Sequence, residues 1–210
     1  MLKILIADDH AVVRRGLKQI LAEEFDEVVF GEAQNTREML KHLQQENWNV
    51  VILDITLPDR SGLELLGELK LTHPNLPVLV LSMHPEDQYG IRVLKSGASG
   101  YMTKECAPDE IAMAIRKVLG GGKYVSPSLA ERLAFNLEDN RKTPPHEGLS
   151  DREFEVMLMI ASGKTLTEIA QKLDLSIKTV STYRSRILEK FKMQNNAELI
   201  RYAIENRLVH

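Results

Sequence analysis

Acidic, hydroxyl and amine side chains follow successive short apolar runs of the sequence. Asp8 and Asp9 come after the first run, Asp54 after a central run, Ser82 after a later one and Lys104 after the last. Neighbouring carboxylates repel one another unless a cation compensates them, and all-oxygen ligands suit Mg²⁺. With Lys104 opposite, such a pocket could hold a phosphoryl group between a metal and an ammonium, while Ser82 donates a hydrogen bond.

Secondary-structure elements must position these residues, and the sequence pattern is typical of buried strands that alternate with amphipathic helices. The apolar runs lie at residues 4–7, 28–30, 50–53 and 78–81, with a weaker one near 101–102. Between the first two runs, Val13, Leu17 and Ile20 fall on one helical face. This alternation predicts right-handed βαβ units and a parallel sheet, whose ligand site lies beyond the carboxyl ends of the strands.

The acidic residues also fit other interpretations. Taken singly, Asp9 or Asp54 could cap the helix that follows its strand. A metal-dependent phosphohydrolase with an aspartyl-phosphate intermediate fits the same carboxylates, but no second acid follows Asp54 until Asp59. A Rossmann enzyme is excluded because the turn "ADDHAVVRRG" after the first run lacks the glycine fingerprint.

The pattern of alternating strands and helices becomes less regular after Gly120–Gly122. Residues 136–148 combine charge with two prolines, which is typical of a linker. Ser150 and Glu153 then form a Ser-x-x-Glu pattern that predicts the start of a helix. Helices expected at 165–173 and 177–192, separated by a turn at 174–176, have the spacing of a helix-turn-helix.

The second of these helices has a polar face that carries Lys178, Thr182 and Ser185, opposite Val180 and Ile187. Small hydroxyl residues beside basic ones suit a DNA major groove, although an ordinary solvated face would look alike. Residues 141–210 hold 12 Lys and Arg against 9 Asp and Glu, a net charge of +3, whereas residues 1–140 hold 15 against 21, or −6. The surplus is compatible with nucleic acid but modest.

The composition and the apolar runs of the sequence bear on disulfide bonding and on the cellular location of the protein. The lone cysteine, Cys106, excludes an intramolecular disulfide framework. The first residues lack a signal-peptide pattern, and no apolar run approaches the ~20 residues that span a bilayer. We therefore expect a soluble, cytoplasmic protein without a membrane partner.

Residues 1–120 resemble a two-component receiver domain in the placement of their acidic pair, central aspartate, hydroxyl and lysine. The resemblance implies a flavodoxin-like fold, that is, a doubly wound α/β domain with a five-stranded parallel sheet. It also implies that Asp54 accepts a phosphoryl group from a sensor histidine kinase. Mg²⁺ would be bound by Asp8, Asp9, Asp54 and the backbone carbonyl of Thr56.

The same resemblance assigns a conformational switch to Ser82 and Tyr101, and phosphate binding to Lys104. Two positions depart from the family pattern. Glu105 follows the lysine where many receivers have proline, and Met83 follows the hydroxyl residue where many have a small side chain. Met83 is expected to narrow access to the pocket.

Residues 149–208, including "LSDREFEVMLMIASGKTLTEIAQKLDLSIKTVSTYRSRILEKF", resemble the LuxR-type output domain of NarL/FixJ-like regulators. The resemblance implies a small all-α helix-turn-helix domain that binds double-stranded promoter DNA and uses its last helix for dimer contacts. The chain departs from the frequent Thr-Val-Lys-x-His pattern at Ser181 and Tyr183. The expected DNA-binding residues are Lys178, Thr179, Ser181, Thr182, Tyr183, Arg184, Ser185 and Arg186.

Together these patterns predict a receiver domain at residues 1–122, a linker at 123–147 and a DNA-binding domain at 148–210. The predicted function is that of a phosphorylation-dependent transcriptional regulator of a two-component system, not of an enzyme. We expect a homodimer when the protein is phosphorylated or bound to DNA. The rival is a LuxR-type regulator that senses a diffusible ligand, for which an aromatic-lined pocket would be expected in the N-terminal domain.

Overall fold

The computed structural model describes residues 1–58, 60–138, 144–206, 208 and 209. The chain divides into two compact units, Met1–Leu133 and Ala134–His210. Part of the expected linker, residues 139–143, lies outside the described residues, as does Asp59.

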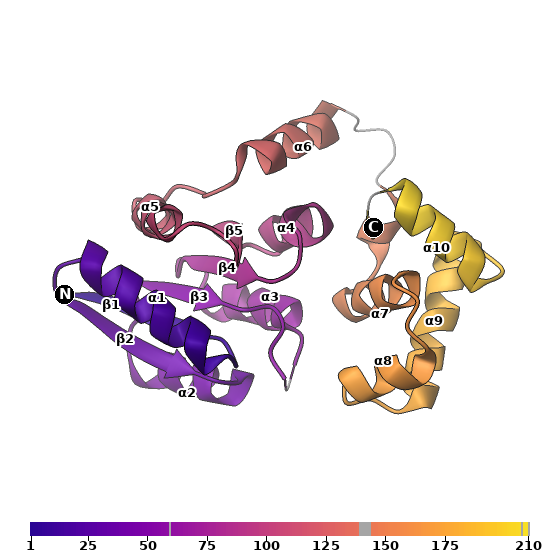
Figure 1. Ribbon diagram of the computed structural model, residues 1–210, viewed down its shortest axis with the longest axis horizontal. Helices are drawn as coiled ribbons and strands as arrows, with labels where there is room; N and C mark the ends of the chain where they lie inside the picture. Colours follow the sequence, from indigo (N-terminus) through magenta and orange to yellow (C-terminus); the bar gives the residue numbers. More distant parts are fainter. Residues whose placement is uncertain (59, 139–143, 207, 210) are drawn as a thin grey trace. The chain divides into compact units, whose positions relative to one another are not determined.

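The first unit is built on a parallel sheet with the strand order β2-β1-β3-β4-β5. The predicted fold class is therefore confirmed, and Figure 1 shows the alternation of strands and helices. The strands are β1 (Leu2–Ala7), β2 (Val28–Ala33), β3 (Val50–Leu53), β4 (Val78–Ser82) and β5 (Gly100–Thr103). The helices are α1 (Ala11–Glu24), α2 (Thr36–Gln45), α3 (Gly62–Thr72), α4 (Glu86–Lys95) and α5 (Pro108–Leu119).

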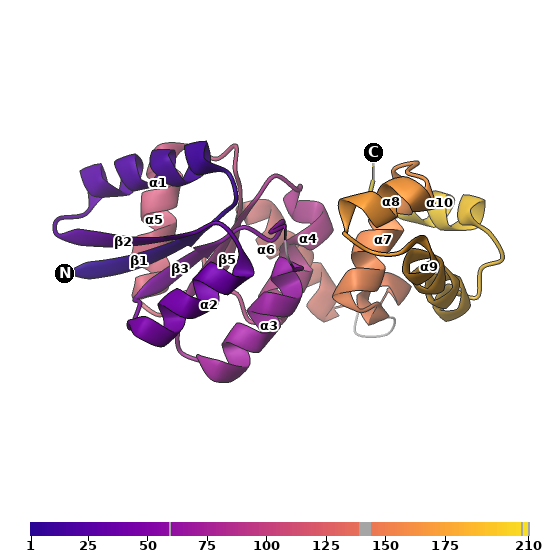
Figure 2. The same ribbon diagram turned by 90° about the horizontal axis from the view of Figure 1, so that it is seen from below.

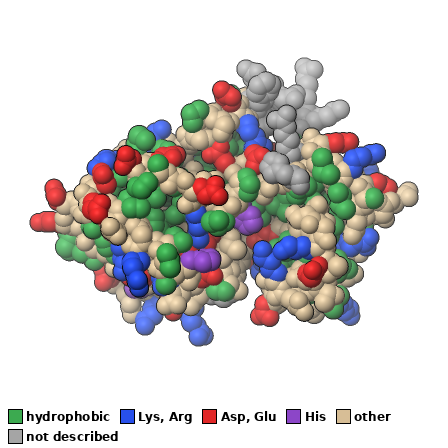
Figure 3. Space-filling view, viewed as in Figure 1, with side chains coloured by type: hydrophobic (Ala, Val, Ile, Leu, Met, Phe, Trp, Pro, Cys, Tyr) green, Lys and Arg blue, Asp and Glu red, His purple; other side chains and the backbone are tan. Residues whose placement is uncertain are grey.

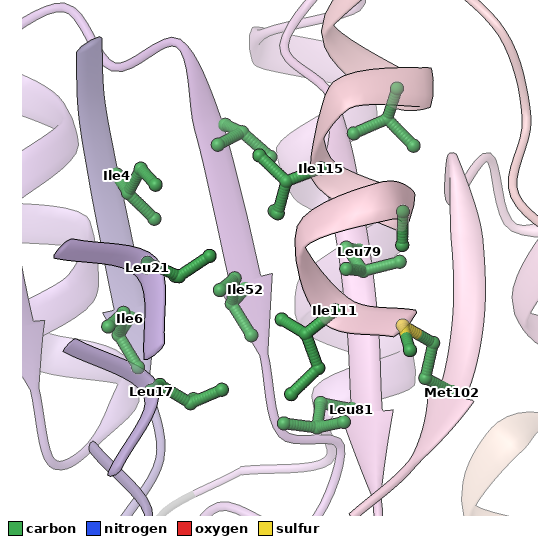
Figure 4. Close-up of a cluster of buried hydrophobic side chains, with 13 residues drawn as sticks. Ile4, Ile6, Leu17, Leu21, Ile52, Leu79, Leu81, Met102, Ile111 and Ile115 are labelled. Carbon is green, nitrogen blue, oxygen red and sulfur yellow. The ribbon is translucent and has the colours of Figure 1, made fainter. Parts of the chain in front are cut away.

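Helices cover both faces of this sheet, so the central strands are apolar on both sides. All four residues of β3 are buried. Figure 2 shows α1 and α5 on one face, with α2 and α3 on the other. On the first face, Leu17 and Leu21 of α1 and Ile111 and Ile115 of α5 pack over side chains of the sheet (Figure 4).

The chain beyond α5 forms a further helix where a linker is expected. Helix α6 spans Pro127–Glu138. The first compact unit extends to Leu133, so the start of α6 is part of it. Leu129, Leu133 and Leu137 recur at the four-residue spacing of a helical face, a signal that the linker prediction did not use. Contacts with α4, far away in the sequence, add to it.

The second unit is helical, and its caps explain where its helices begin. It contains η1 (Pro145–Gly148), α7 (Asp151–Ala161), α8 (Leu166–Lys172), α9 (Ile177–Phe191) and α10 (Asn196–Glu205). The predicted capping box of Ser150 and Glu153 is present at the start of α7. A second box, formed by Thr165 and Glu168, begins α8. The helix-turn-helix expected from the spacing is formed by α8 and α9.

Charged side chains of both signs are scattered over the face of the molecule in Figure 3. Among the residues that the structure describes, no helix combines the length and apolar character needed to cross a membrane.

Candidate functional site

The carboxyl ends of β1 and β3 bring Asp8 and Asp54 to one buried cluster. Both residues are buried, with Asp54 only 3 % exposed. The Nζ atom of Lys104, which follows β5, lies 2.6 Å from Oδ2 of Asp8 and 2.6 Å from Oδ2 of Asp54. The backbone amide of Lys104 donates to the Ser82 carbonyl at 2.8 Å, which ties the lysine to the end of β4. Three strand ends thus supply one ammonium and two carboxylates to a single pocket.

The pocket raises the pKa values of both Asp54 and Lys104, but for different physical reasons. Burial raises the pKa of the Asp54 carboxyl, against the opposing effects of Lys104 and of the Thr56 amide. Burial by itself disfavours the charged form of Lys104, but its hydrogen bonds to the two aspartates outweigh burial and raise the pKa of the ammonium. A cation therefore already compensates part of the negative charge at Asp54.

Asp9 and His10 line the exposed side of this cluster. One ligand atom each from Asp8, Asp9, His10 and Asp54 can be chosen so that all lie within 4.8 Å of one another. Nδ1 of His10 lies 2.7 Å from Oδ1 of Asp9, and the His10 side chain is 61 % exposed. Three carboxylates in such a cluster match the oxygen donors that hard divalent cations prefer.

Backbone amides and a buried arginine hold the two buried aspartates in place. The Thr56 amide donates to Oδ1 of Asp54 at 2.9 Å. The His10 amide donates to Oδ1 of Asp8 at 2.8 Å, and Nη1 of Arg14 donates to the Asp8 carbonyl at 2.8 Å. Sequence reasoning missed Arg14, although its place on the apolar face of the first helix was a signal that it is buried.

Ser82 and Tyr101 meet at the backbone of one residue, His84. The His84 amide donates to Oγ of Ser82 at 3.1 Å, and the Tyr101 hydroxyl donates to the His84 carbonyl at 2.7 Å. Both side chains are buried. The two expected switch residues therefore bind the backbone amide and the backbone carbonyl of His84, which lies between β4 and α4. Met83, beside them, is 65 % exposed, so most of its side chain faces solvent.

The expected DNA-binding residues lie on α9, whose apolar side faces the core of the second unit. Val180 and Ile187 are fully buried. Four of the eight expected residues are exposed, namely Lys178, Thr182, Ser185 and Arg186. The hydroxyls of Thr182 and Ser185 donate to the carbonyls of Lys178 and Ser181, so they lie close to their own helix.

The other four expected residues, Thr179, Ser181, Tyr183 and Arg184, are partly buried. Nε of Arg184 donates to Oδ1 of Asn196 on α10 at 2.6 Å, so this side chain connects two helices of its own domain. The expected DNA-binding residues thus fall into two groups, one exposed on the polar face of α9 and one partly buried within the domain.

A parallel α/β domain with an aspartate–lysine pocket, in one chain with a helix-turn-helix, defines the class of two-domain response regulators.

Comparisons with known proteins agree with this class. Residues 4–116 match the response regulator receiver domain family, and residues 147–203 match the luxR family of bacterial regulatory proteins. The chain is 37 % identical to response regulator GacA of Pseudomonas aeruginosa, over 100 % of this chain and 98 % of that protein. It is 34 % identical to response regulator UvrY of Escherichia coli K12, over 99 % and 96 % of the two chains.

Solved structures give the same result. RcsB from Salmonella enterica serovar Typhimurium, bound to promoter rprA in the presence of the phosphomimetic BeF₃⁻, superposes with a TM-score of 0.66 at 28 % identity. The match covers 96 % of this chain and 98 % of that one. The chain belongs to the response regulators that join a receiver domain to a LuxR-type regulatory domain, and it is a regulator of a two-component system rather than an enzyme.

Proposed function

We propose that Asp54 accepts a phosphoryl group from a sensor histidine kinase and that this event controls binding of the second domain to promoter DNA. The observation that carries the proposal is the pairing of buried Asp54 with Lys104 at 2.6 Å, at the carboxyl end of the central strand. In the transfer, the phosphorus–nitrogen bond of a phosphohistidine breaks and a phosphorus–oxygen bond to Asp54 forms. Lys104 then stabilises negative charge on the phosphoryl oxygens.

Mg²⁺ is the proposed cation of the pocket. Asp8, Asp9, Asp54 and the Thr56 carbonyl would hold it, and when bound it would neutralise charge on the phosphoryl oxygens. The clustered carboxylates support this assignment through their oxygen donors. Asp9→Ala should leave Asp54 intact but weaken Mg²⁺ binding in a calorimetric titration. Unchanged affinity would remove Asp9 from the set of ligands.

The test of the phosphoacceptor compares Asp54→Ala with the exposed control Asp26→Ala. Labelling by a phosphorylated histidine kinase, and binding of beryllofluoride with Mg²⁺, should disappear only in Asp54→Ala. Undiminished labelling of Asp54→Ala would overturn the assignment, because another residue would then carry the phosphoryl group.

The DNA-binding part of the proposal assigns base and phosphate contacts to the exposed face of α9, with the receiver controlling formation of a homodimer. The related RcsB was solved on promoter DNA, and another structure holds two RcsB dimers on two parallel DNAs. A dimer of this chain in the cytoplasm would bind a roughly palindromic site with half-sites about one helical turn apart. Footprints that lengthen from one half-site to two on phosphorylation would support this view. A phosphorylated protein that protects a single half-site would contradict it.

A further inference from the structure

The segment between α5 and α6 is built onto the edge of the receiver sheet. The Tyr124 amide donates to the Ser99 carbonyl at 2.8 Å, and Tyr124 pairs with Gly100 in a parallel β-bridge beside β5. A Cβ atom at Gly100 would lie 2.7 Å from the Tyr124 carbonyl oxygen, so only glycine permits this approach. The chain therefore leaves the receiver along a fixed path.

The first turn of α6 is attached to the first turn of α4 by one carboxylate. Oε1 of Glu86 accepts hydrogen bonds from Oγ of Ser126 at 2.6 Å and from Oγ of Ser128 at 2.8 Å. Hydrogen bonds to an ionised acceptor are shorter and stronger than neutral ones. Ser126 also accepts the Leu129 amide at 3.0 Å and so caps α6. The cap of α6 thus depends on the same hydroxyl that contacts α4.

An apolar contact lies one turn further along both helices. Leu129 is fully buried, and a Cβ atom at Gly90 of α4 would lie 2.9 Å and 3.0 Å from the two Leu129 methyl groups. A glycine inside a helix costs about 1 kcal/mol relative to alanine. Because Leu129 leaves too little room for a Cβ atom at residue 90, glycine fits this point of α4 despite its cost to the helix. We call the contacts of Glu86 and Gly90 with Ser126, Ser128 and Leu129 the α4–α6 clasp.

In the described ranges, helices α4 and α6 each carry a buried side-chain atom that lacks a hydrogen-bond partner. Within the described part of the chain, the buried atoms Oδ1 of Asp87 on α4 and Nη1 of Arg132 on α6 have no hydrogen-bond partner. Buried polar atoms without partners cost free energy. Each of the two helices that the clasp joins therefore carries a polar group whose burial is uncompensated.

Glu86, the first residue of the clasp, comes two residues after His84, which the switch residues bind. His84 is bound through its amide to Ser82 and through its carbonyl to Tyr101, and Glu86 starts α4. If Ser82 moves toward a phosphoryl group on Asp54, its hydroxyl leaves the His84 amide. The first turn of α4, which carries Glu86, then shifts relative to Ser126 and Ser128.

We propose that the α4–α6 clasp is closed in the unphosphorylated receiver and opens on phosphorylation of Asp54, which frees α6, the helix that leads to the DNA-binding domain. This inference rests on the proposed function of Asp54 and adds a path from the pocket to the linker. It makes Glu86 and Gly90 positioning residues, which act through α6 and not on the phosphoryl group.

Amide hydrogen exchange of the full chain tests the proposal with matched variants. Gly90→Ala places a methyl group against Leu129 and should open the clasp without phosphorylation. Gly67→Ala is the control, because Gly67 lies in α3 and a Cβ there meets nothing within 4 Å. Amides at residues 129–134 should exchange about 10-fold faster in Gly90→Ala, as in wild-type protein with Mg²⁺ and beryllofluoride, while Gly67→Ala stays unchanged.

The outcomes separate the clasp from the function of the pocket. If beryllofluoride changes exchange at residues 54–58 but leaves residues 129–134 unchanged, the clasp proposal is wrong while the pocket stands. If beryllofluoride changes nothing near Asp54, the proposed phosphoacceptor fails instead. Equal exchange of residues 129–134 in Gly90→Ala and wild type would also overturn the clasp. Amides of β1 and β3 report whether each variant remains folded.

Discussion

The phenolic hydroxyl of Tyr101 donates a 2.7 Å hydrogen bond to the backbone carbonyl of His84. Tyr101 is 1 % exposed, and burial raises the pKa of its hydroxyl, so the group remains a protonated donor at physiological pH. The bond connects β5 with the segment that precedes α4. A side chain next to the candidate phosphorylation pocket thereby fixes the backbone at the start of α4.

Tyr101→Phe should remove this bond while keeping the aromatic ring. The His84 carbonyl loses its donor, so we expect the free energy of unfolding of the receiver to fall by about 1 kcal/mol. Amides of residues 83–86 should exchange faster. Tyr183→Phe, in the other domain, is the control. Unchanged exchange at residues 83–86 in Tyr101→Phe would mean that the hydroxyl does not hold this segment.

Lys104→Met should destabilise the receiver because it leaves Asp8 and Asp54 buried beside each other without their ammonium. Loss of one partner of a buried ion pair costs about 3 kcal/mol. Mg²⁺ would replace part of the lost charge, so the thermal midpoint should rise more with magnesium chloride in Lys104→Met than in wild type. Lys41→Met, on the exposed side of α2, controls for the loss of a lysine. Equal magnesium responses would contradict the prediction.

The sheet and the pocket were predictable from the sequence for a simple physical reason. A strand covered by helices on both faces is apolar along its whole length, as in β3, and the polar residue after it must lie at the carboxyl edge. Asp8, Asp54 and Lys104 could therefore be placed together. The capping box at Ser150 was equally local and is confirmed.

Features that depend on distant contacts could not be predicted in this way. Helix α6 is held by Glu86 and Gly90, about 40 residues before it, and no short-range pattern reports such contacts. The bond from Arg184 to Asn196 is similar, since an arginine on an amphipathic helix looks like a candidate DNA contact until the neighbouring helix is placed. A sequence pattern shows which face of a helix or strand is apolar. Which residues of two different helices or strands contact each other is known only once the fold is known.

Glu153 is predicted to make the stability of the second domain depend on acid pH. It is buried, and Oε2 lies 2.6 Å from Nζ of Lys190 on α9. Burial favours the neutral carboxyl, but the hydrogen bonds from Lys190 and Ser150 outweigh burial and lower the pKa of Glu153 below 4.5. Its stabilising contribution is therefore complete above the unfolded-state pKa and is lost as pH falls through the folded-state value.

Glu153→Gln keeps an acceptor for the Ser150 amide but removes the charge that pairs with Lys190. At pH 7 it should lower the free energy of unfolding by about 1 kcal/mol, and the difference from wild type should shrink as pH falls below 4.5. Urea titrations followed through amide resonances of α7 measure this difference. Glu189→Gln, on the exposed face of α9, is the control. A difference that is constant from pH 7 to pH 3 would exclude the ion pair as its cause.

The face of α9 that carries Lys178, Thr182 and Ser185 is expected to dock against the bases of DNA. Thr182 is exposed, and its hydroxyl is turned back to the Lys178 carbonyl, so the helix surface there is low enough to approach base edges closely. Thr182→Arg places a long side chain at the centre of this face. It should prevent close docking in the major groove, although its added charge strengthens general attraction to phosphates.

The specific and general effects of Thr182→Arg are separated by measuring affinity for a DNA fragment selected by the wild-type protein and for an unrelated competitor. The ratio of the two affinities should fall about 10-fold or more, while binding to the competitor is kept or increased. Gln194→Arg adds the same charge in the exposed connection between α9 and α10 and should preserve the ratio. Circular dichroism establishes that both variants are folded. A folded Thr182→Arg protein with the wild-type ratio would mean that α9 meets DNA through another face, because an arginine at the centre of a closely docked surface could not leave base-specific contacts undisturbed.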